Sequence, residues 1–135
     1  MGAEFALSSP AKAGLAGAED LTLIVRARSE AERACQAALF TSLVVLAATR
    51  FGGQPPLALS GAGDRASQQL RDVAMYLMHT QFKFTQAQVA AVAGLVRYSA
   101  GRAIQRIEDA RDDGVFNWKL QGLETLAADA LRAAA

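Results

Sequence analysis

Residues 85–113 contain two helix-forming segments separated by a single glycine, and this arrangement constrains the fold more than any other part of the chain. Thr85 and Gln88 have the capping-box spacing, which predicts that a short helix begins there. Gly94 then supplies a turn, and a second helix is predicted over residues 97–112. Two helices joined by a tight turn form the helix-turn-helix pattern.

A long helix is predicted nearer the N-terminus, over residues 29–51. Ser29 and Glu32 have the capping-box form, and the middle of the segment, residues 37–48, is apolar almost all round. This run has about a dozen residues, fewer than the roughly 18 that a membrane span needs, which favours a buried core helix and no membrane contact. The apolar run at residues 21–25 has no second strand to pair with, so it is expected to be a helix lead-in or a packing segment.

Two more helices complete the expected fold. Residues 65–80 have apolar side chains at the three-four spacing of a half-buried helix. Gly114 is expected to end the helix over residues 97–112 as its C-cap, and Asn117 to cap a last helix over residues 118–134. The side chains that this last helix is expected to bury are Trp118, Leu123, Leu126 and Leu131. The expected fold class is all-α with about five helices.

The domain organisation is expected to be simple. Residues 1–19 are mostly alanine, glycine, serine and proline with little charge, which predicts disorder. Residues 1–5 have the sequence of a cloning remnant, because Glu-Phe is what an EcoRI site encodes. Residues 20–135 are expected to form a single helical domain, with the helix-turn-helix at residues 85–113.

The charge distribution indicates a local basic patch. The net charge of +1 gives no overall signal for nucleic acid, but no acidic residue lies between Asp72 and Glu108. The basic residues in this interval are Lys83, Arg97, Arg102 and Arg106. Phosphate binding requires a local patch of this kind, although a chance run of solvated arginines has the same composition.

Three segments resemble the C-terminal DNA-binding domain of the bacterial replication initiator DnaA. Ala74-Met-Tyr-Leu77 is similar to the start of that family's long helix, and residues 85–92 are similar to the first helix of its helix-turn-helix. Residues 102–108 are similar to its recognition helix, which ends in an Ile-Glu pair like Ile107-Glu108. The resemblance extends weakly upstream to about Ala31. It implies an all-α fold with a helix-turn-helix and double-stranded DNA as the partner.

The sequence differs from this family where the family reads DNA. The family has Arg-Asp-His-Thr-Thr at the start of the recognition helix, and residues 95–99 here are Leu, Val, Arg, Tyr and Ser. The family's basic residues ahead of the long helix reach the minor groove, and here only Arg65 matches them. We therefore expect altered or relaxed sequence specificity.

The recognition helix has one apolar and one polar face. Ala100, Ala103, Ile104 and Ile107 are expected to pack inward. Arginine, glutamine, tyrosine and serine on the other face are suited to contact base edges and phosphates. The residues expected to contact DNA are Arg65, Lys83, Arg97, Tyr98, Ser99, Arg102, Gln105 and Arg106.

These observations predict a small bacterial DNA-binding protein that controls replication initiation or transcription in the cytoplasm, associated with the nucleoid. A second hypothesis is a protein-interaction module that keeps the scaffold and binds the initiator or its regulators through Leu95 and Val96. A third is a structural homodimer through residues 39–46. The sequence leaves the oligomeric state open.

Catalysis, metal binding and cofactors are not expected. With one histidine and one cysteine, the sequence offers no catalytic triad, no thiolate zinc site and no internal disulfide, and it has no glycine-rich phosphate loop. Cys35 is expected to be a buried, inert thiol. His79 is expected to be a surface or partly buried residue close to DNA phosphate.

Overall fold

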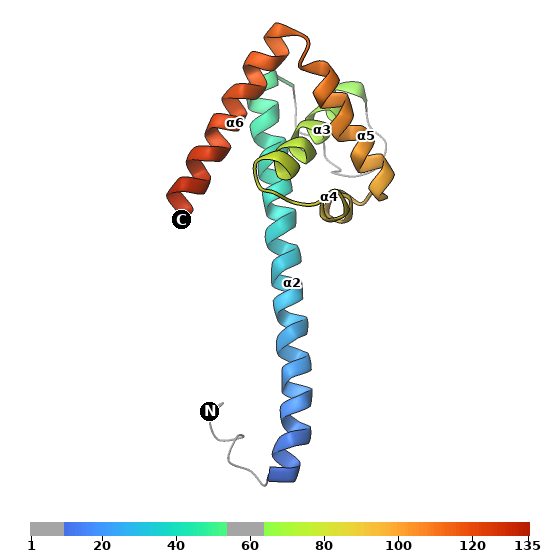
Figure 1. Ribbon diagram of the computed structural model, residues 1–135, viewed down its shortest axis with the longest axis vertical. Coiled ribbons are helices and arrows are strands. Elements are labelled where there is room, and N and C mark those ends of the chain that lie inside the picture. The colour runs from blue at the N-terminus through green and yellow to red at the C-terminus, as the bar shows by residue number, and fades with distance from the viewer. Residues whose placement is uncertain (1–9, 54–63) are drawn as a thin grey trace. The chain divides into compact units, whose positions relative to one another are not determined.

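The structure is a computed structural model that describes residues 10–53 and 64–135. This part of the chain contains five helices and no strand (Figure 1). The helices are α2 (Pro10–Phe51), α3 (Arg65–Thr80), α4 (Gln86–Ala93), α5 (Arg97–Ala110) and α6 (Gly114–Ala134). The all-α fold class with about five helices is therefore confirmed.

The chain divides into two compact units, Met1–Cys35 and Gln36–Ala135, and the first consists, where it is described, of the beginning of α2. From the sequence we expected the helical domain to begin near residue 20 and its first helix to begin at Ser29. In the structure α2 begins earlier, at Pro10. Ser29 lies inside the helix, where the alanine-rich sequence allows helical backbone to continue through a capping-box pattern. Residues 1–9, within the segment expected to be disordered, lie outside the described residues.

The apolar run at residues 21–25, which was expected to be a helix lead-in or a packing segment, lies inside α2. Leu21, Leu23, Ile24 and Val25 are each 60–62% exposed in the first unit. Cys35 is exposed as well, so the expectation of a buried thiol is wrong. The alanines around Cys35 suggested a core position, but the buried part of α2 begins only at Phe40.

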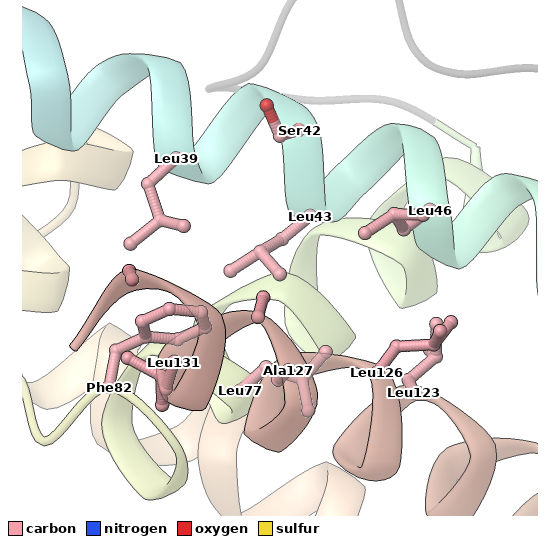
Figure 2. A pocket seen from close by; sticks show the side chains of 12 residues that line it. Leu39, Ser42, Leu43, Leu46, Leu77, Phe82, Leu123, Leu126, Ala127 and Leu131 are labelled. Carbon is pink, nitrogen blue, oxygen red and sulfur yellow. The ribbon is translucent and has the colours of Figure 1, made fainter.

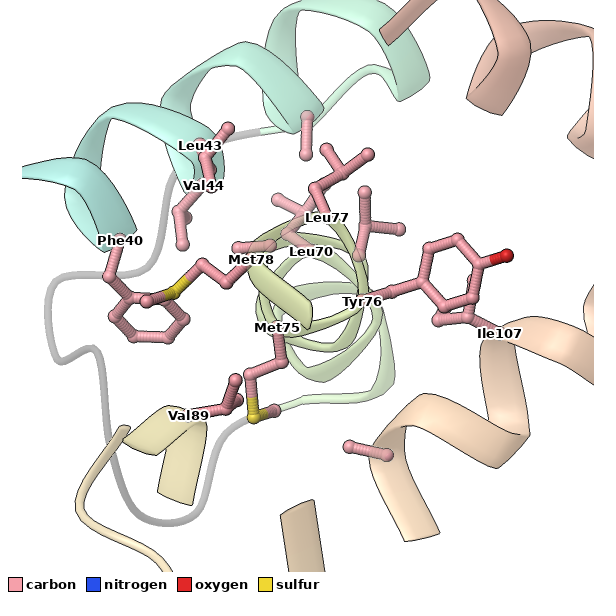
Figure 3. Close-up of a cluster of buried hydrophobic side chains, with 14 of the residues drawn as sticks. Phe40, Leu43, Val44, Leu70, Met75, Tyr76, Leu77, Met78, Val89 and Ile107 are labelled. Atoms are coloured by element: carbon pink, nitrogen blue, oxygen red, sulfur yellow. The ribbon is translucent and has the colours of Figure 1, made fainter. Parts of the chain in front are cut away.

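α3 is the central helix of the second unit. Every residue from Leu70 to Met78 is buried, whereas the sequence predicted only a half-buried helix. Figure 3 looks along α3 and shows why, because side chains from three other helices surround it. Phe40 and Val44 come from α2, Val89 from α4 and Ile107 from α5.

α2 contributes to this core through one face. Phe40, Leu43, Val44 and Ala47 are buried, while Leu46 is 41% exposed, so only one face of the predicted buried helix at residues 37–48 lies in the core. The stretch Glu19–Phe51 is also long and apolar enough to cross a membrane by length and composition alone. Core helices of soluble proteins pass the same test.

The turn between α4 and α5 forms as predicted. Thr85 caps α4 with the full capping box, in which Gln88 N donates to the Thr85 hydroxyl and Thr85 N donates to Gln88 Oε1. Gly94 adopts the left-handed conformation with φ of 72°, which glycine reaches without a steric penalty. Leu95 N then donates to Ala90 O at 2.8 Å. α5 starts at Arg97 with Val96 as its N-cap.

The predicted start of α6 is wrong. Asp113 caps the helix by accepting a hydrogen bond from Phe116 N at 3.0 Å, and Gly114 is the first helical residue of α6, not the C-cap of α5. Asn117 is not a cap because its Oδ1 accepts a hydrogen bond from Arg111 Nε at 2.7 Å. Arg111 also donates to both carboxylate oxygens of Glu124, so it fixes the beginning of α6.

The outer face of α6 was also predicted differently. Leu123 is buried as expected, but Trp118 is 63% exposed and Leu126 52% exposed, with Leu131 also exposed. The guanidinium of Arg50 lies 4.6 Å from the centroid of the Trp118 ring. Trp118 therefore packs against a cation at the surface instead of entering the core.

Candidate nucleic-acid interface

The N-terminal half of α5 presents an exposed polar face. Its inner face is buried as predicted, with Ala100, Ala103, Ile104 and Ile107 in the core. The outer residues surround a shallow depression of about 350 Å³. The depression is lined by Gln86, Arg97, Tyr98, Gly101, Arg102 and Gln105. Four of the eight predicted contact residues therefore lie together here.

Tyr98 and Arg102 form a pair at this depression. Arg102 Nη1 donates to the Tyr98 hydroxyl at 3.1 Å, one helical turn away, and the guanidinium lies 5.8 Å from the ring centroid. Tyr98 is 72% exposed. The pair therefore presents donors and an aromatic ring to solvent.

Two close contacts shape the rest of the depression. A Cβ added at Gly101 would lie 3.2 Å from Gln86 Oε1, so the absence of a side chain at Gly101 makes room for the first residue of α4. Gln105 Nε2 donates to Asp109 Oδ1 at 3.0 Å, which uses one of the two N–H groups of the Gln105 amide. The sequence analysis did not identify Gln86 as a residue of this site, although its position directly after the Thr85 cap places a polar side chain in the first turn of α4.

Arg106 has a different environment from the one expected. Its Nε donates to Asp72 Oδ2 at 2.8 Å and its Nη2 to Asp72 Oδ1 at 3.1 Å. The Asp72 side chain is only 6% exposed, and this hydrogen bonding raises the pKa of Arg106. Arg106 therefore joins α5 to α3 and neutralises a buried carboxylate. The sequence offered one signal for this ion pair, because an aspartate inside the apolar segment of α3 requires a charged partner when it is buried.

The other predicted contact residues lie outside the depression. Lys83 is exposed in the turn between α3 and α4, with a left-handed φ of 63°, and its Nζ donates to Thr80 O at 3.0 Å. Arg65 is exposed at the first residue of α3, and Ser99 is half-buried. The ring Nδ1 of half-buried His79 lies 2.7 Å from Phe84 O.

The cationic character of this face comes from fewer residues than the sequence suggested. Because Asp72 pairs with Arg106, the basic side chains near α4 and α5 that form no ion pair within the described residues are Lys83, Arg97 and Arg102. The acidic residues of α5 and its end lie at the far end of the helix. They are Glu108, Asp109, Asp112 and Asp113.

A second surface feature is an apolar groove between α2 and α6, about 360 Å³ in volume (Figure 2). Leu39, Leu43 and Leu46 of α2 face Leu126 and Leu131 of α6 across it. Ser42 is the sole polar side chain among its described lining residues. The groove explains why Leu126 and Leu131, which the sequence placed in the core, are still partly exposed.

No protein-family model, curated protein or solved structure matches this chain. Among the described residues, no group of three His, Cys, Asp or Glu side chains gathers as a metal site would require. The geometry of the α5 face is therefore the basis for assigning a function.

Proposed function

We propose that this protein binds double-stranded DNA, with α4, the Gly94 turn and α5 acting as a helix-turn-helix. The observation that carries the proposal is the grouping of Arg97, Tyr98 and Arg102 at the exposed N-terminal half of α5. In helix-turn-helix proteins the N-terminal residues of the second helix contact base edges in the major groove. The proposed role requires no catalytic group and no cofactor.

The beginning of α5 supports this orientation. Val96, its N-cap, makes no side-chain capping hydrogen bond, so its side chain does not cover the N–H groups of the first turn. Such N–H groups and the helix dipole favour an anion. Glu108 and Asp109, in contrast, would repel phosphate, which directs the N-terminal half of α5 toward the duplex.

The biological role that fits this chemistry is control of replication initiation or of transcription, in the cytoplasm and close to the nucleoid. The resemblance to the C-terminal domain of DnaA supports replication. Positions 95 and 96 are leucine and valine where that family has arginine and aspartate, so we propose altered or relaxed sequence specificity. Apolar side chains contact at most a thymine methyl group.

The test is a mobility-shift titration of random-sequence duplex at several salt concentrations. On random-sequence duplex, where no guanine has been selected opposite Arg102, the cations Lys83, Arg97 and Arg102 are all expected to contact phosphates, so the slope of log K against log salt should be about −2.7, at about −0.9 per phosphate. Lys83→Ala should make this slope less steep by about one, because one phosphate contact is lost. It should also weaken binding to all sequences by the same factor. Absence of any shift at low salt would contradict the proposal.

The second candidate function is a protein-interaction module that binds the replication initiator or one of its regulators. The observation that favours it is the apolar groove between α2 and α6, whose lining can receive apolar side chains of a partner. Of the two residues first expected to serve a partner, Val96 is 68% exposed but Leu95 packs against the core. The same titration separates the two functions, because this candidate predicts no salt-dependent duplex binding.

A further inference from the structure

We infer that Arg102 contacts the major-groove edge of a guanine and that Tyr98 holds the guanidinium in position for this contact. This inference rests on the proposed DNA-binding function and adds the base that α5 recognises. It makes Arg102 the specificity-determining residue of the depression and Tyr98 a positioning residue.

The first argument is the restraint on Arg102. A solvent-exposed arginine samples many rotamers, and ordering it on binding costs about 2 kcal/mol of side-chain entropy. Here the hydroxyl of Tyr98 accepts a hydrogen bond from Nη1 at 3.1 Å, and the ring lies beside the guanidinium. Part of that ordering is therefore present before DNA binds.

The second argument is the set of donors that remains. A guanidinium has five N–H groups, and the Tyr98 hydroxyl takes one of them. The remaining N–H groups still include one on Nε and one on Nη2 that can point in the same direction, as a bidentate contact requires. Guanine presents two acceptors, O6 and N7, whereas adenine presents one acceptor and one donor. A group that only donates therefore matches guanine.

The third argument compares Arg102 with Gln105, another polar side chain that lines the depression. Gln105 has the side chain that pairs with adenine, and one of its two amide N–H groups is already donated to Asp109 Oδ1 at 3.0 Å, on the side of the acidic end of α5. Arg102, by contrast, forms no ion pair within the described residues.

The experiment is selection of duplexes from a random-sequence pool, followed by sequencing, with the full-length wild type and three variants. Wild type should enrich guanine at a defined position. Arg102→Ala should reduce this preference by about 5- to 150-fold, as for loss of a bidentate base contact. Tyr98→Phe, which keeps the ring and removes the hydroxyl, should reduce it by about 2- to 10-fold. Lys83→Ala is the matched control and should weaken binding without changing base preference.

A second measurement uses the enriched duplex with 7-deazaguanine at the selected position, which removes the N7 acceptor. Wild type should bind it more weakly than the guanine duplex, while Arg102→Ala should bind both equally. Tyr98 is 72% exposed, so Tyr98→Phe should fold normally, which a thermal melt verifies.

The outcomes distinguish this inference from the function on which it rests. If wild type binds the pool without enriching guanine, or if Tyr98→Phe keeps the full preference, the inference is wrong and the DNA-binding proposal stands. If wild type does not bind the pool at low salt, both are wrong.

Discussion

Arg106 of α5 is held by Asp72 of α3 through two parallel hydrogen bonds of 2.8 and 3.1 Å. The carboxylate is buried and the guanidinium reaches it from the surface, with 6% and 44% of the two side chains exposed. This contact joins the helix that carries the polar depression to the central helix of the core. It also separates Arg106 from the other two arginines of α5, Arg97 and Arg102, which form no ion pair within the described residues.

The first prediction follows from that separation. Arg106→Ala should lower the free energy of unfolding by about 1.5–3 kcal/mol, because it leaves the buried Asp72 without its charged donor. Arg102→Ala, on the exposed face of the same helix, should change it by no more than about 0.5 kcal/mol. Denaturant unfolding of both variants measures this. Equal effects would mean that the ion pair contributes nothing to the fold.

The second prediction concerns the facing of α5. Ile104→Ala should destabilise the protein by about 2–5 kcal/mol, because Ile104 is 7% exposed and its truncation leaves a cavity. Gln105→Ala removes an exposed side chain that bonds only Asp109, and should cost no more than about 0.5 kcal/mol. Thermal melts compare the two neighbours, and similar melting shifts would contradict the burial pattern of this helix.

The third prediction concerns pH. Asp64 Oδ1 accepts a hydrogen bond from Ser67 N at 2.7 Å, and this bond lowers the pKa of Asp64 below its ordinary value. A carboxyl whose pKa is lowered by folding stabilises the fold above its unfolded pKa, about 3.9, and loses this contribution as the pH falls through the folded value. Asp64→Asn keeps a capping side chain but does not titrate.

The melting temperature of wild type should therefore exceed that of Asp64→Asn near neutral pH, and the difference should close below about pH 4. Asp64→Ala, which has no capping oxygen, should melt below both near neutral pH. A wild-type advantage over Asp64→Asn that stays constant across this range would show that the charge on Asp64 does not stabilise α3.

The fourth prediction concerns specificity. We expect no strong preference for the recognition sequence of DnaA, because residues 95 and 96 lack the arginine and aspartate that this family uses. Competition between an initiator-box duplex and a scrambled duplex measures the preference. A preference for the initiator-box duplex of about a thousandfold or more, the lower bound for specific over non-specific binding, would show that the protein has the specificity of the DnaA family and would contradict this prediction.

Local signals in the sequence were sufficient to predict the turn at the centre of the candidate site. The hydroxyl of Thr85, the amide of Gln88 and the left-handed Gly94 act within a few residues of one another, and all three do what their types indicate. The inward face of α5 was also predictable, because helical periodicity decides it. The fold class follows from the same kinds of signal.

Side-chain contacts that the capping and periodicity patterns do not include decided the rest. Asn117 is a good capping residue, but Arg111 binds its Oδ1, and Asp113 caps α6 in its place. The ion pair of Arg106 was not predicted because its partner, Asp72, lies 34 residues away in sequence. Neither competition is visible in a local pattern, because each depends on how the helices pack.

The measurement that tests the central claim most directly is the affinity for a random-sequence duplex of the Arg97→Ala, Arg102→Ala double variant. Its matched control is Arg132→Ala, which removes an exposed arginine of α6 that pairs with Asp129. Mobility-shift titrations at low salt should show the double variant binding at least about tenfold more weakly than wild type. Arg132→Ala should bind as wild type does. If the double variant binds DNA as tightly as wild type, the N-terminal half of α5 is not the DNA-binding surface.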